Sequence, residues 1–271
     1  YYELLKFCKS KKIKFLSSVF DNESIVFLKN ELKINTIKIP SGEITNPLIL
    51  DRLNLKHYYV ILSTGMSNIK EIVNAINIIS KKVIYKIVNK KIIINNKKEF
   101  NIIKKKLIVM HCVTDYPVED RYANLQCINT MQNDLKIEIG YSDHTKGIIA
   151  PLIAVSKGAK VIEKHFTINK NMKGPDHLAS LNPQEFKKMV ESIRTFEKMN
   201  GDGIKKMFNC ERINKKIARK SLIANTVIKK GERFTYRNIT TKRPGNGVCS
   251  SKFKKYINTI SKKNYQPDDF I

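Results

Sequence analysis

The stretch from residue 140 to residue 167 constrains the fold of this chain more than any other. It contains two short apolar runs of the kind that form buried strands, and each run leads to a histidine, His144 and His165. A helix-like segment separates the two runs. In a strand–helix–strand unit both strands run parallel and their carboxyl ends share one rim, which is where ligands bind in α/β folds. We therefore expect His144 and His165 to be neighbours on the floor of a pocket.

Two imidazoles beside Asp143 and Glu163 fit a divalent-metal site. Their nitrogen atoms suit Mn, Fe or Zn, and such a site keeps coordination positions open for substrate and water. The alternative is that both histidines are hydrogen-bonded side chains in a polar crevice. The spacing alone leaves both interpretations open.

The same alternation runs through the first part of the chain. Asp21 is expected to cap the helix that follows it, because its carboxylate can accept a bond from a free backbone amide. The period of the apolar residues predicts strands at 13–17, 36–39, 58–62, 107–112, 137–139 and 160–162, and helices at 1–11, 21–32, 68–80, 124–133 and 183–199. Strands that alternate with helices and end in polar residues predict a parallel α/β barrel of the TIM type. A complete barrel needs two more strands, which we expect to precede Tyr1.

The pattern also predicts the domain organisation. Residues 1–200 form the barrel, with a low-complexity insertion at about 81–106 that we expect at the surface, in part as a β-ribbon. The alternation of strands and helices ends after the run Asn-Gly-Asp-Gly at 200–203. We expect a linker at 201–212 and a small, mainly β domain at 213–271.

The charge of the chain does not indicate a specific nucleic-acid partner. Lys and Arg number 51 against 24 Asp and Glu, which gives a formal net charge of +27. The excess is mostly lysine spread among isoleucine and asparagine, and tryptophan is absent. A nucleic-acid site would be richer in arginine, with aromatic side chains for stacking. Solvated lysine faces are the favoured interpretation, and part of the charge can attract phosphorylated substrates.

Cysteine usage and hydropathy place the chain in a reducing compartment away from the membrane. The five cysteines are widely spaced and form no CxxC pair, so neither a zinc ribbon nor a disulfide framework is indicated. No run of about twenty apolar residues offers a membrane span. We predict a cytoplasmic protein. The first residue is Tyr1 and not Met, so the question of an upstream targeting peptide stays open.

Eight motifs, in order along the chain, resemble one family: the N-acetylneuraminate (sialic acid) synthases with their legionaminate and pseudaminate synthase relatives. The motifs are FLSSVFD at 15–21, KIPSGE at 38–43, STGM at 63–66, HC through YP at 111–117, GYSDHT at 140–145, EKHF at 163–166, GPDH at 174–177 and RPGNG at 243–247. One such motif is weak, but eight in one order are specific.

The resemblance implies an activity. The family condenses phosphoenolpyruvate with an open-chain N-acetylhexosamine, usually N-acetylmannosamine, with the help of a divalent metal, typically Mn²⁺, with Mg²⁺ or Co²⁺ as alternatives. His144 and His165 match its metal ligands. The other matching positions are Lys38, Ser41 and Ser142 for phosphoenolpyruvate, with Ser18, Ser63 and Thr114 as weaker candidates, Glu43 and Asp176 as catalytic carboxylates, and Tyr116 and Arg243 as further substrate contacts.

Each assignment has a plainer alternative. Lys38 could be a surface lysine, although it stands between Ile37 and Ile39, where an inward charge is rare without a partner. Glu43 could be a helix-start charge, and the hydroxyls could be caps at strand ends. Tyr116 could be an aromatic lid, and Thr114 stands where some members have asparagine.

The C-terminal part resembles the antifreeze-like (SAF) domain of these synthases. In the family this domain crosses to the partner subunit, which implies a domain-swapped homodimer in which Arg243 reaches the sugar site of the other chain. An exposed loop charge is the alternative.

The departures from the family leave competing hypotheses about the function. The first two strands of the family and their substrate-binding loops are absent from the sequence, so the barrel is expected to have an open edge and the chain to be inactive alone. A second hypothesis is that the chain is a keto-deoxy-sugar phosphate synthase, although this does not explain residues 243–247. A catalytically inactive, truncated relative that binds polyanions through its basic surface is the non-enzyme alternative.

Overall fold

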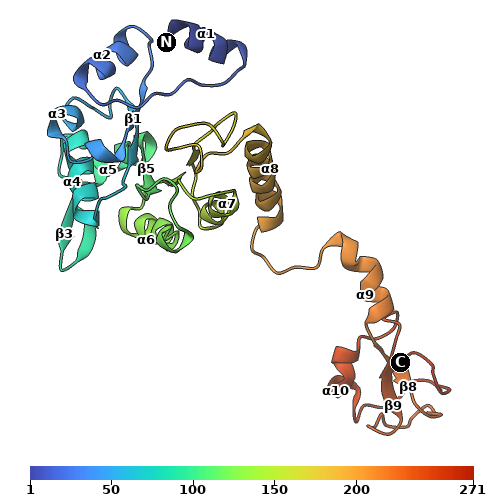
Figure 1. Cartoon of the computed structure of the whole chain (residues 1–271). Coiled ribbons are helices and arrows are strands. Elements are labelled where there is room, and N and C mark those ends of the chain that lie inside the picture. Colours follow the sequence, from blue (N-terminus) through green and yellow to red (C-terminus); the bar gives the residue numbers. More distant parts are fainter. The chain divides into compact units, whose positions relative to one another are not determined.

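Two units make up the chain, and each is described by itself. The structure is a computed structural model that describes residues 1–271, and its units are Tyr1–Gly201 and Asp202–Ile271 (Figure 1). None of the helices combines the length and the apolar character that crossing a bilayer requires.

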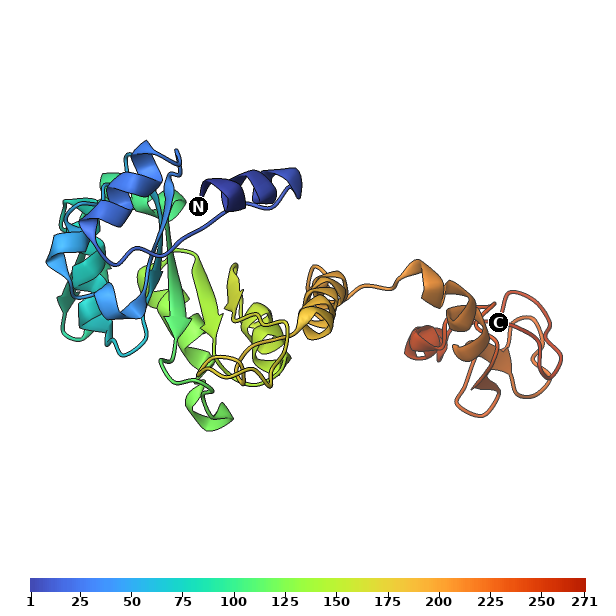
Figure 2. The ribbon, with the colours of Figure 1, turned by 45° about the horizontal axis from the view of Figure 1, so that its top comes forward.

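The first unit is built on one curled, fully parallel sheet (Figure 2). Its strands pair in the order β1-β2-β5-β6-β7, so strands that follow one another along the sheet also follow one another along the chain. Their bounds are β1 Thr36–Ile39, β2 Tyr59–Ser63, β5 Leu107–Cys112, β6 Ile139–Asp143 and β7 Ile162–Lys164. The carboxyl ends of all of them therefore lie on one rim, as the strand–helix alternation predicts.

Helices connect the strands, and several of them begin at residues whose side chains cap the first turn. The carboxylate of Asp21 accepts the backbone N–H of Ser24 at 2.6 Å, so this predicted cap is confirmed. Asn68 and Asn182 begin α4 and α8 with capping boxes. The helices of this unit are α1 Tyr2–Ser10, α2 Asn22–Asn30, α3 Pro47–Leu50, α4 Ile69–Ser80, α5 Lys97–Lys106, α6 Gln126–Leu135, α7 Ile149–Ser156 and α8 Pro183–Asn200.

The two faces of the sheet differ in chemistry. Apolar side chains of one face, such as Ile37, Leu62 and Val109, are fully buried in the core under the helices. The residues between them face the inside of the curl. The strand register sets Ser63 beside Met110, and Cys112 beside Ser142, which in turn lies beside Glu163. Because paired residues of neighbouring parallel strands share a face, polar groups gather on this inner face.

The predicted strand at 13–17 is wrong. Only Ser18 forms a bridge to Lys38, and the backbone N–H of Val19 donates to the Lys38 carbonyl at 3.1 Å. Ile13 is 64% exposed, and the apolar alternation of this segment does not produce a ladder. The sheet therefore has five strands and forms a half-barrel instead of the six-stranded arc that the sequence predicts. β6 and β7 also begin two residues later than expected.

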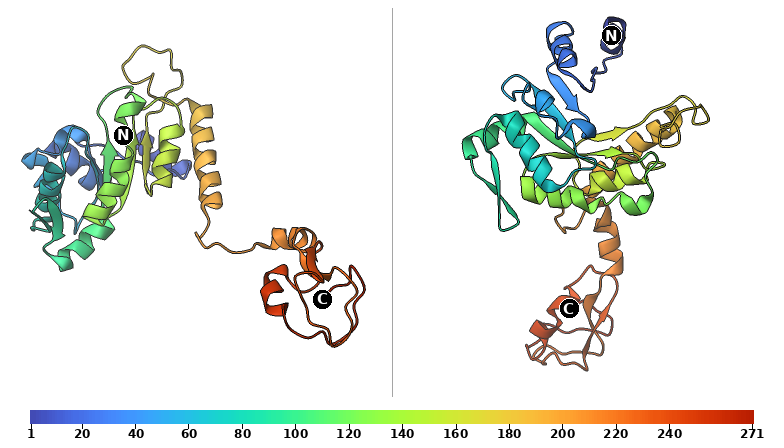
Figure 3. Two further views of the ribbon diagram at one scale, coloured as in Figure 1. Left: turned by 90° about the horizontal axis from the view of Figure 1, so that it is seen from below. Right: turned by 60° about the vertical axis from the view of Figure 1, so that its left-hand side comes forward.

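The low-complexity stretch is more than a surface excursion. The predicted ribbon is present, because β3 Tyr85–Val88 and β4 Lys91–Ile94 pair antiparallel, and Figure 3 shows the hairpin. Tyr85 is only 1% exposed and its hydroxyl donates to the Leu135 carbonyl at 2.5 Å. The helix α5, which follows the ribbon, is missing from the sequence prediction. It buries Ile103, so this stretch contributes to the core.

The second unit is small and contains little regular structure. The helix α9 Arg212–Ala218 precedes an antiparallel pair, β8 Ser221–Ala224 and β9 Ile239–Lys242, and a short α10 Phe253–Tyr256 follows (Figure 3). Its core consists of Ala224, Ile228, Phe234, Ile239 and Tyr265. Isolated bridges, for example between Ile228 and Tyr265, join its loops to this core.

Candidate active site

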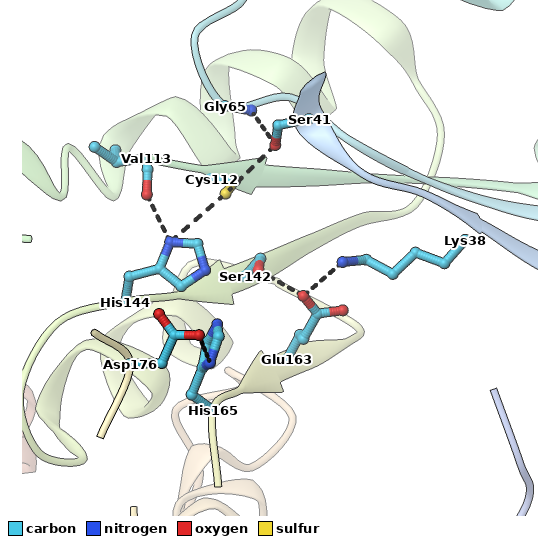
Figure 4. Close-up of polar contacts among 10 residues, drawn as sticks. All are labelled: Lys38, Ser41, Gly65, Cys112, Val113, Ser142, His144, Glu163, His165 and Asp176. Atoms are coloured by element: carbon cyan, nitrogen blue, oxygen red, sulfur yellow. Dashed lines mark hydrogen bonds and ion pairs between the residues drawn. The ribbon is translucent and has the colours of Figure 1, made fainter. Parts of the chain in front are cut away.

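A cluster of polar side chains lies on the inner face at the carboxyl ends of the strands (Figure 4). Glu163 on β7 is its centre. The ammonium of Lys38 lies 2.7 Å from Glu163 Oε1, and the hydroxyl of Ser142 donates to the same oxygen at 2.8 Å. Ser18, Lys38, Glu163 and His165 line a pocket of about 370 Å³. The inward charge that the sequence predicts at Lys38 is present, and its partner is Glu163, which the sequence analysis placed beside the metal site and not beside Lys38.

Ser41 and Thr114 approach each other around a glycine. The Gly65 N–H donates to Ser41 Oγ at 2.9 Å, and the same hydroxyl contacts Cys112 Sγ at 3.8 Å. A Cβ atom at Gly65 would lie 2.1 Å from Thr114 Oγ1. Only glycine therefore lets the two hydroxyls lie this close at the rim.

The hydroxyl of Ser63 has no hydrogen-bond partner within the protein, although the residue is only 2% exposed. An unsatisfied buried hydroxyl costs about 1–3 kcal/mol, so native proteins keep few of them. Ser63 follows Ile61 on the inner face, and Ile61 pairs with Lys38. The unpaired hydroxyl therefore belongs to a residue on the same face as Lys38.

His144 is held as a neutral imidazole. Its Nδ1 lies 2.6 Å from the Val113 carbonyl, and because a carbonyl can only accept, Nδ1 carries the proton and Nε2 keeps its lone pair. Burial lowers the pKa of His144 below its usual value, and this outweighs the Val113 hydrogen bond, which acts in the opposite direction. A neutral imidazole with a free Nε2 is the form that binds a metal.

His165 faces His144 across the rim. The ring centroids are 5.3 Å apart with the planes at 68°, and Asp176 Oδ2 lies 3.7 Å from Nδ1 of His165. No third His, Cys, Asp or Glu joins them to form a protein-only cage. The donor set is therefore two imidazole nitrogens, which suits a cation whose other positions are taken by substrate and water.

Asp143 does not belong to this donor set, contrary to the expectation that it flanks the metal. Its side chain and that of Lys164 are both fully buried, with 2.6 Å between Nζ and Oδ2. The Tyr141 hydroxyl and the Thr145 N–H also donate to Asp143 Oδ1, at 3.0 and 2.9 Å. The pair joins the ends of β6 and β7 one residue before each histidine. Aligning the motifs Asp-His and Lys-His at the ends of these two neighbouring strands would have predicted this ion pair.

The other predicted residues divide into two groups. Tyr116 covers the histidines, with its ring centroid 4.2 Å from that of His144 and 5.5 Å from that of His165. Partial burial raises the pKa of the Tyr116 hydroxyl. Glu43 instead accepts the amide of Asn46 at 2.7 Å, and its side chain forms no hydrogen bond or ion pair with the other predicted residues. Arg243 lies in the second unit, where its Nε donates to the Ala218 carbonyl at 2.9 Å.

Comparisons with known proteins agree with the family that the motifs indicate. The model of the NeuB family matches residues 1–205. The chain is 45% identical to an N,N'-diacetyllegionaminic acid synthase of Campylobacter jejuni over 99% of its own length and 75% of the relative. It is 36% identical to the enzyme of that name from Legionella pneumophila, over 95% of this chain and 67% of that one. A crystal structure of N-acetylneuraminic acid (sialic acid) synthetase from Leptospira borgpetersenii matches 78% of this chain and 67% of its own, with a TM-score of 0.64 and 32% identity.

Proposed function

Because the chain belongs to the NeuB family, we propose that it condenses phosphoenolpyruvate with an open-chain N-acetylhexosamine to give a nonulosonate and phosphate. The observation that carries the proposal is the convergence of Lys38 and Ser142 on Glu163, beside two imidazoles on the inner rim of the sheet. This arrangement offers positive charge and hydroxyl donors to a phosphorylated carboxylate next to a metal-binding pair.

Lys38, Ser41 and Ser142 bind phosphoenolpyruvate in this proposal. The side chain of Lys38 is only 13% exposed, so its charge acts at short range in a site of low dielectric. A trianionic substrate competes with Glu163 for that ammonium. Further donors at the rim are Ser63, whose hydroxyl has no protein partner, Thr114 beside Gly65, and Ser18 in the wall of the pocket.

His144 and His165 would hold a divalent cation, Mn²⁺ in the first place and Mg²⁺ or Co²⁺ otherwise. When bound, such a cation polarises the carbonyl of the sugar aldehyde. The chain contributes the orientation: the Val113 carbonyl sets the tautomer of His144, and Asp176 lies beside the Nδ1 of His165. The ring of Tyr116 excludes water from one side of the pair.

The reaction is an aldol-type addition followed by hydrolysis of the phosphate group. C3 of the enol attacks the aldehyde carbon of the sugar, and the developing alkoxide takes up a proton. Water adds at C2, and cleavage of the C–O bond releases inorganic phosphate. We assign the proton transfers to Glu43 and Asp176, and the Asn46 amide keeps Glu43 in one orientation.

The second unit is the SAF domain in this proposal. Its Arg243 reaches the sugar site of the partner subunit in a domain-swapped homodimer. The exposed surface of Arg243 supports this assembly.

N-acetylmannosamine is the proposed acceptor, and a diacetylated hexose is the second candidate because two relatives are N,N'-diacetyllegionaminic acid synthases. The test is phosphate release from phosphoenolpyruvate with each sugar and Mn²⁺, beside the His144→Ala variant, on the folded dimer. Release that needs sugar and metal and disappears in the variant supports the proposal. A folded dimer that releases no phosphate with either sugar would favour the inactive, polyanion-binding alternative.

A further inference from the structure

The second unit contains a strongly basic pocket that the proposed reaction does not use. Its volume is about 510 Å³, and Met207, Gly245 and Cys249 form part of its wall. The remaining lining residues are all cationic: Arg212, Lys215, Lys216, Arg219 and Lys220. No carboxylate and no aromatic ring lines it.

The charge of this pocket is not compensated within the chain. The ion pairs of the structure, ten in all, include none of the five cations. The neighbouring carboxylate of Glu211 accepts the Phe208 N–H at 2.8 Å and so serves the local backbone. Like charges held this close repel one another, and a bound anion would relieve that repulsion.

The framework of the pocket is fixed by hydrogen bonds between α9 and the loop after β9. The Gly245 N–H donates to the Lys216 carbonyl at 2.6 Å, and the Ser250 N–H donates to the Lys220 carbonyl at 3.1 Å. A Cβ atom at Gly245 would lie 3.0 Å from the Cβ of Arg219, so the loop packs directly against the basic segment. Three of the cations lie on α9 and two directly follow it, and these hydrogen bonds fix the backbone that carries them.

We propose that this pocket binds a small ligand that carries a diphosphate or triphosphate group. Such a group has a charge of about −3 to −4 at neutral pH, which the five cations of the pocket exceed. Arginine offers a planar fork for phosphate oxygens, and two of the five are arginines. The volume is that of a small-molecule site. A nucleic-acid strand would in addition require aromatic rings for stacking, which the pocket lacks.

Cys249 provides a reporter inside the pocket. The Ser251 hydroxyl lies 3.2 Å from its Sγ, and this hydrogen bond, together with the backbone of Ser251 and the nearby Arg219 and Lys215, lowers the pKa of the thiol. The thiolate is the reactive form, so Cys249 should react readily with anionic disulfide reagents. The exposed Cys210, in the same unit but outside the pocket wall, is the internal reference.

The primary test is calorimetric titration of the full chain with inorganic pyrophosphate, with inorganic phosphate as the weaker comparison. The triple variant Arg212→Gln, Lys215→Gln and Arg219→Gln should raise the Kd for pyrophosphate about tenfold or more, the cost of losing at least one charge-assisted hydrogen bond. The matched control changes three exposed lysines of α5, Lys97, Lys98 and Lys104, to Gln and removes the same charge. Equal weakening by both variants, or no saturable binding to the unaltered chain, would overturn the proposal.

The second test leaves the pocket unaltered. Pyrophosphate should slow the reaction of Cys249 with a dianionic aromatic disulfide at least several-fold, as read by mass spectrometry, without slowing that of Cys210. Protection of both cysteines, or of neither, would contradict the proposal. Duplex DNA that protects Cys249 when pyrophosphate does not would likewise overturn it, in favour of a nucleic-acid surface.

Discussion

Replacement of Lys164 by methionine should lower the unfolding free energy of the first unit far more than the same replacement of a partly exposed lysine. Lys164 and Asp143 form the one ion pair in the chain whose two side chains are both fully buried, 2.6 Å apart. Methionine fills a similar volume but leaves the carboxylate of Asp143 without a counter-charge, with only the Tyr141 hydroxyl and the Thr145 N–H as donors. The substitution also removes the hydrogen bond from Lys164 Nζ to the Thr145 carbonyl.

Breaking a buried pair by removing one partner costs about 3–5 kcal/mol of unfolding free energy. The assay is urea denaturation followed by circular dichroism. The control is Lys170→Met, because Lys170 and Glu185 pair at 2.7 Å with side chains 30% and 36% exposed. Solvent screening limits that loss to about 1 kcal/mol or less. If both variants lose the same free energy, the reasoning about burial is wrong. A double replacement, Asp143→Leu with Lys164→Met, should recover much of the loss.

Three further predictions concern single groups. Gly65→Ala should raise the KM for phosphoenolpyruvate about tenfold or more, because the new Cβ would lie 2.1 Å from Thr114 Oγ1. The control Gly42→Ala, whose Cβ would meet nothing within 4 Å, should leave the KM unchanged. Ser63→Ala should weaken binding of phosphoenolpyruvate, measured by calorimetry, yet leave the melting temperature unchanged or higher, because it removes an unsatisfied buried hydroxyl; a lower melting temperature would contradict this. Burial lowers the pKa of His111 in the folded chain, so the unfolded chain binds more protons. The unfolding free energy should therefore fall as the pH drops below about 6.5. For this group the fall is at most about 1.4 kcal/mol per pH unit. In His111→Asn that slope, measured by urea titrations at several pH values, should be smaller.

Much of the sheet follows from local sequence. β1 and β5 have the bounds that the apolar residues predict. The alternation of β1 follows from burial of one face, whereas β5 is buried along nearly its whole length. The run at 13–17 is also rich in apolar residues but forms no ladder, and only Ser18 after it forms a bridge, to Lys38. Pairing depends on a neighbouring strand, which periodicity cannot supply. The sequence does not predict the helix α5, because its few apolar residues stand among lysines and give no clear period. Asn96, which accepts the Glu99 N–H at 3.1 Å, was its visible start signal.

The sequence predicts that the two histidines are neighbours, but it does not predict the ion pairs and hydrogen bonds around them. Motifs place the two histidines on one rim, and the ring centroids 5.3 Å apart agree with that placement. What spacing does not reveal is which charges neutralise each other across strands. The pairs Lys38 with Glu163 and Asp143 with Lys164 join residues from strands whose register is set by the fold as a whole.

The pair between Lys38 and Glu163 implies that this carboxylate competes with phosphoenolpyruvate. Glu163 occupies the ammonium of Lys38 and the hydroxyl of Ser142, the same two donors that we assign to phosphoenolpyruvate. The substrate must therefore displace Glu163, and its own negative charge is repelled by that carboxylate. Glu163→Gln removes the charge but keeps an oxygen that can accept from both donors.

We expect Glu163→Gln to bind phosphoenolpyruvate more tightly than the unaltered chain, by about tenfold, which corresponds to about 1.4 kcal/mol. That is a modest part of the Coulomb energy between two anions in a partly buried pocket. Equilibrium dialysis without sugar or metal isolates this step from catalysis. Ser142→Ala, which removes a donor and keeps the carboxylate, should weaken binding in the same assay. Weaker binding by Glu163→Gln as well would mean that Glu163 holds the substrate and does not compete with it, and the assignment of Lys38 to the phosphate would then have to change.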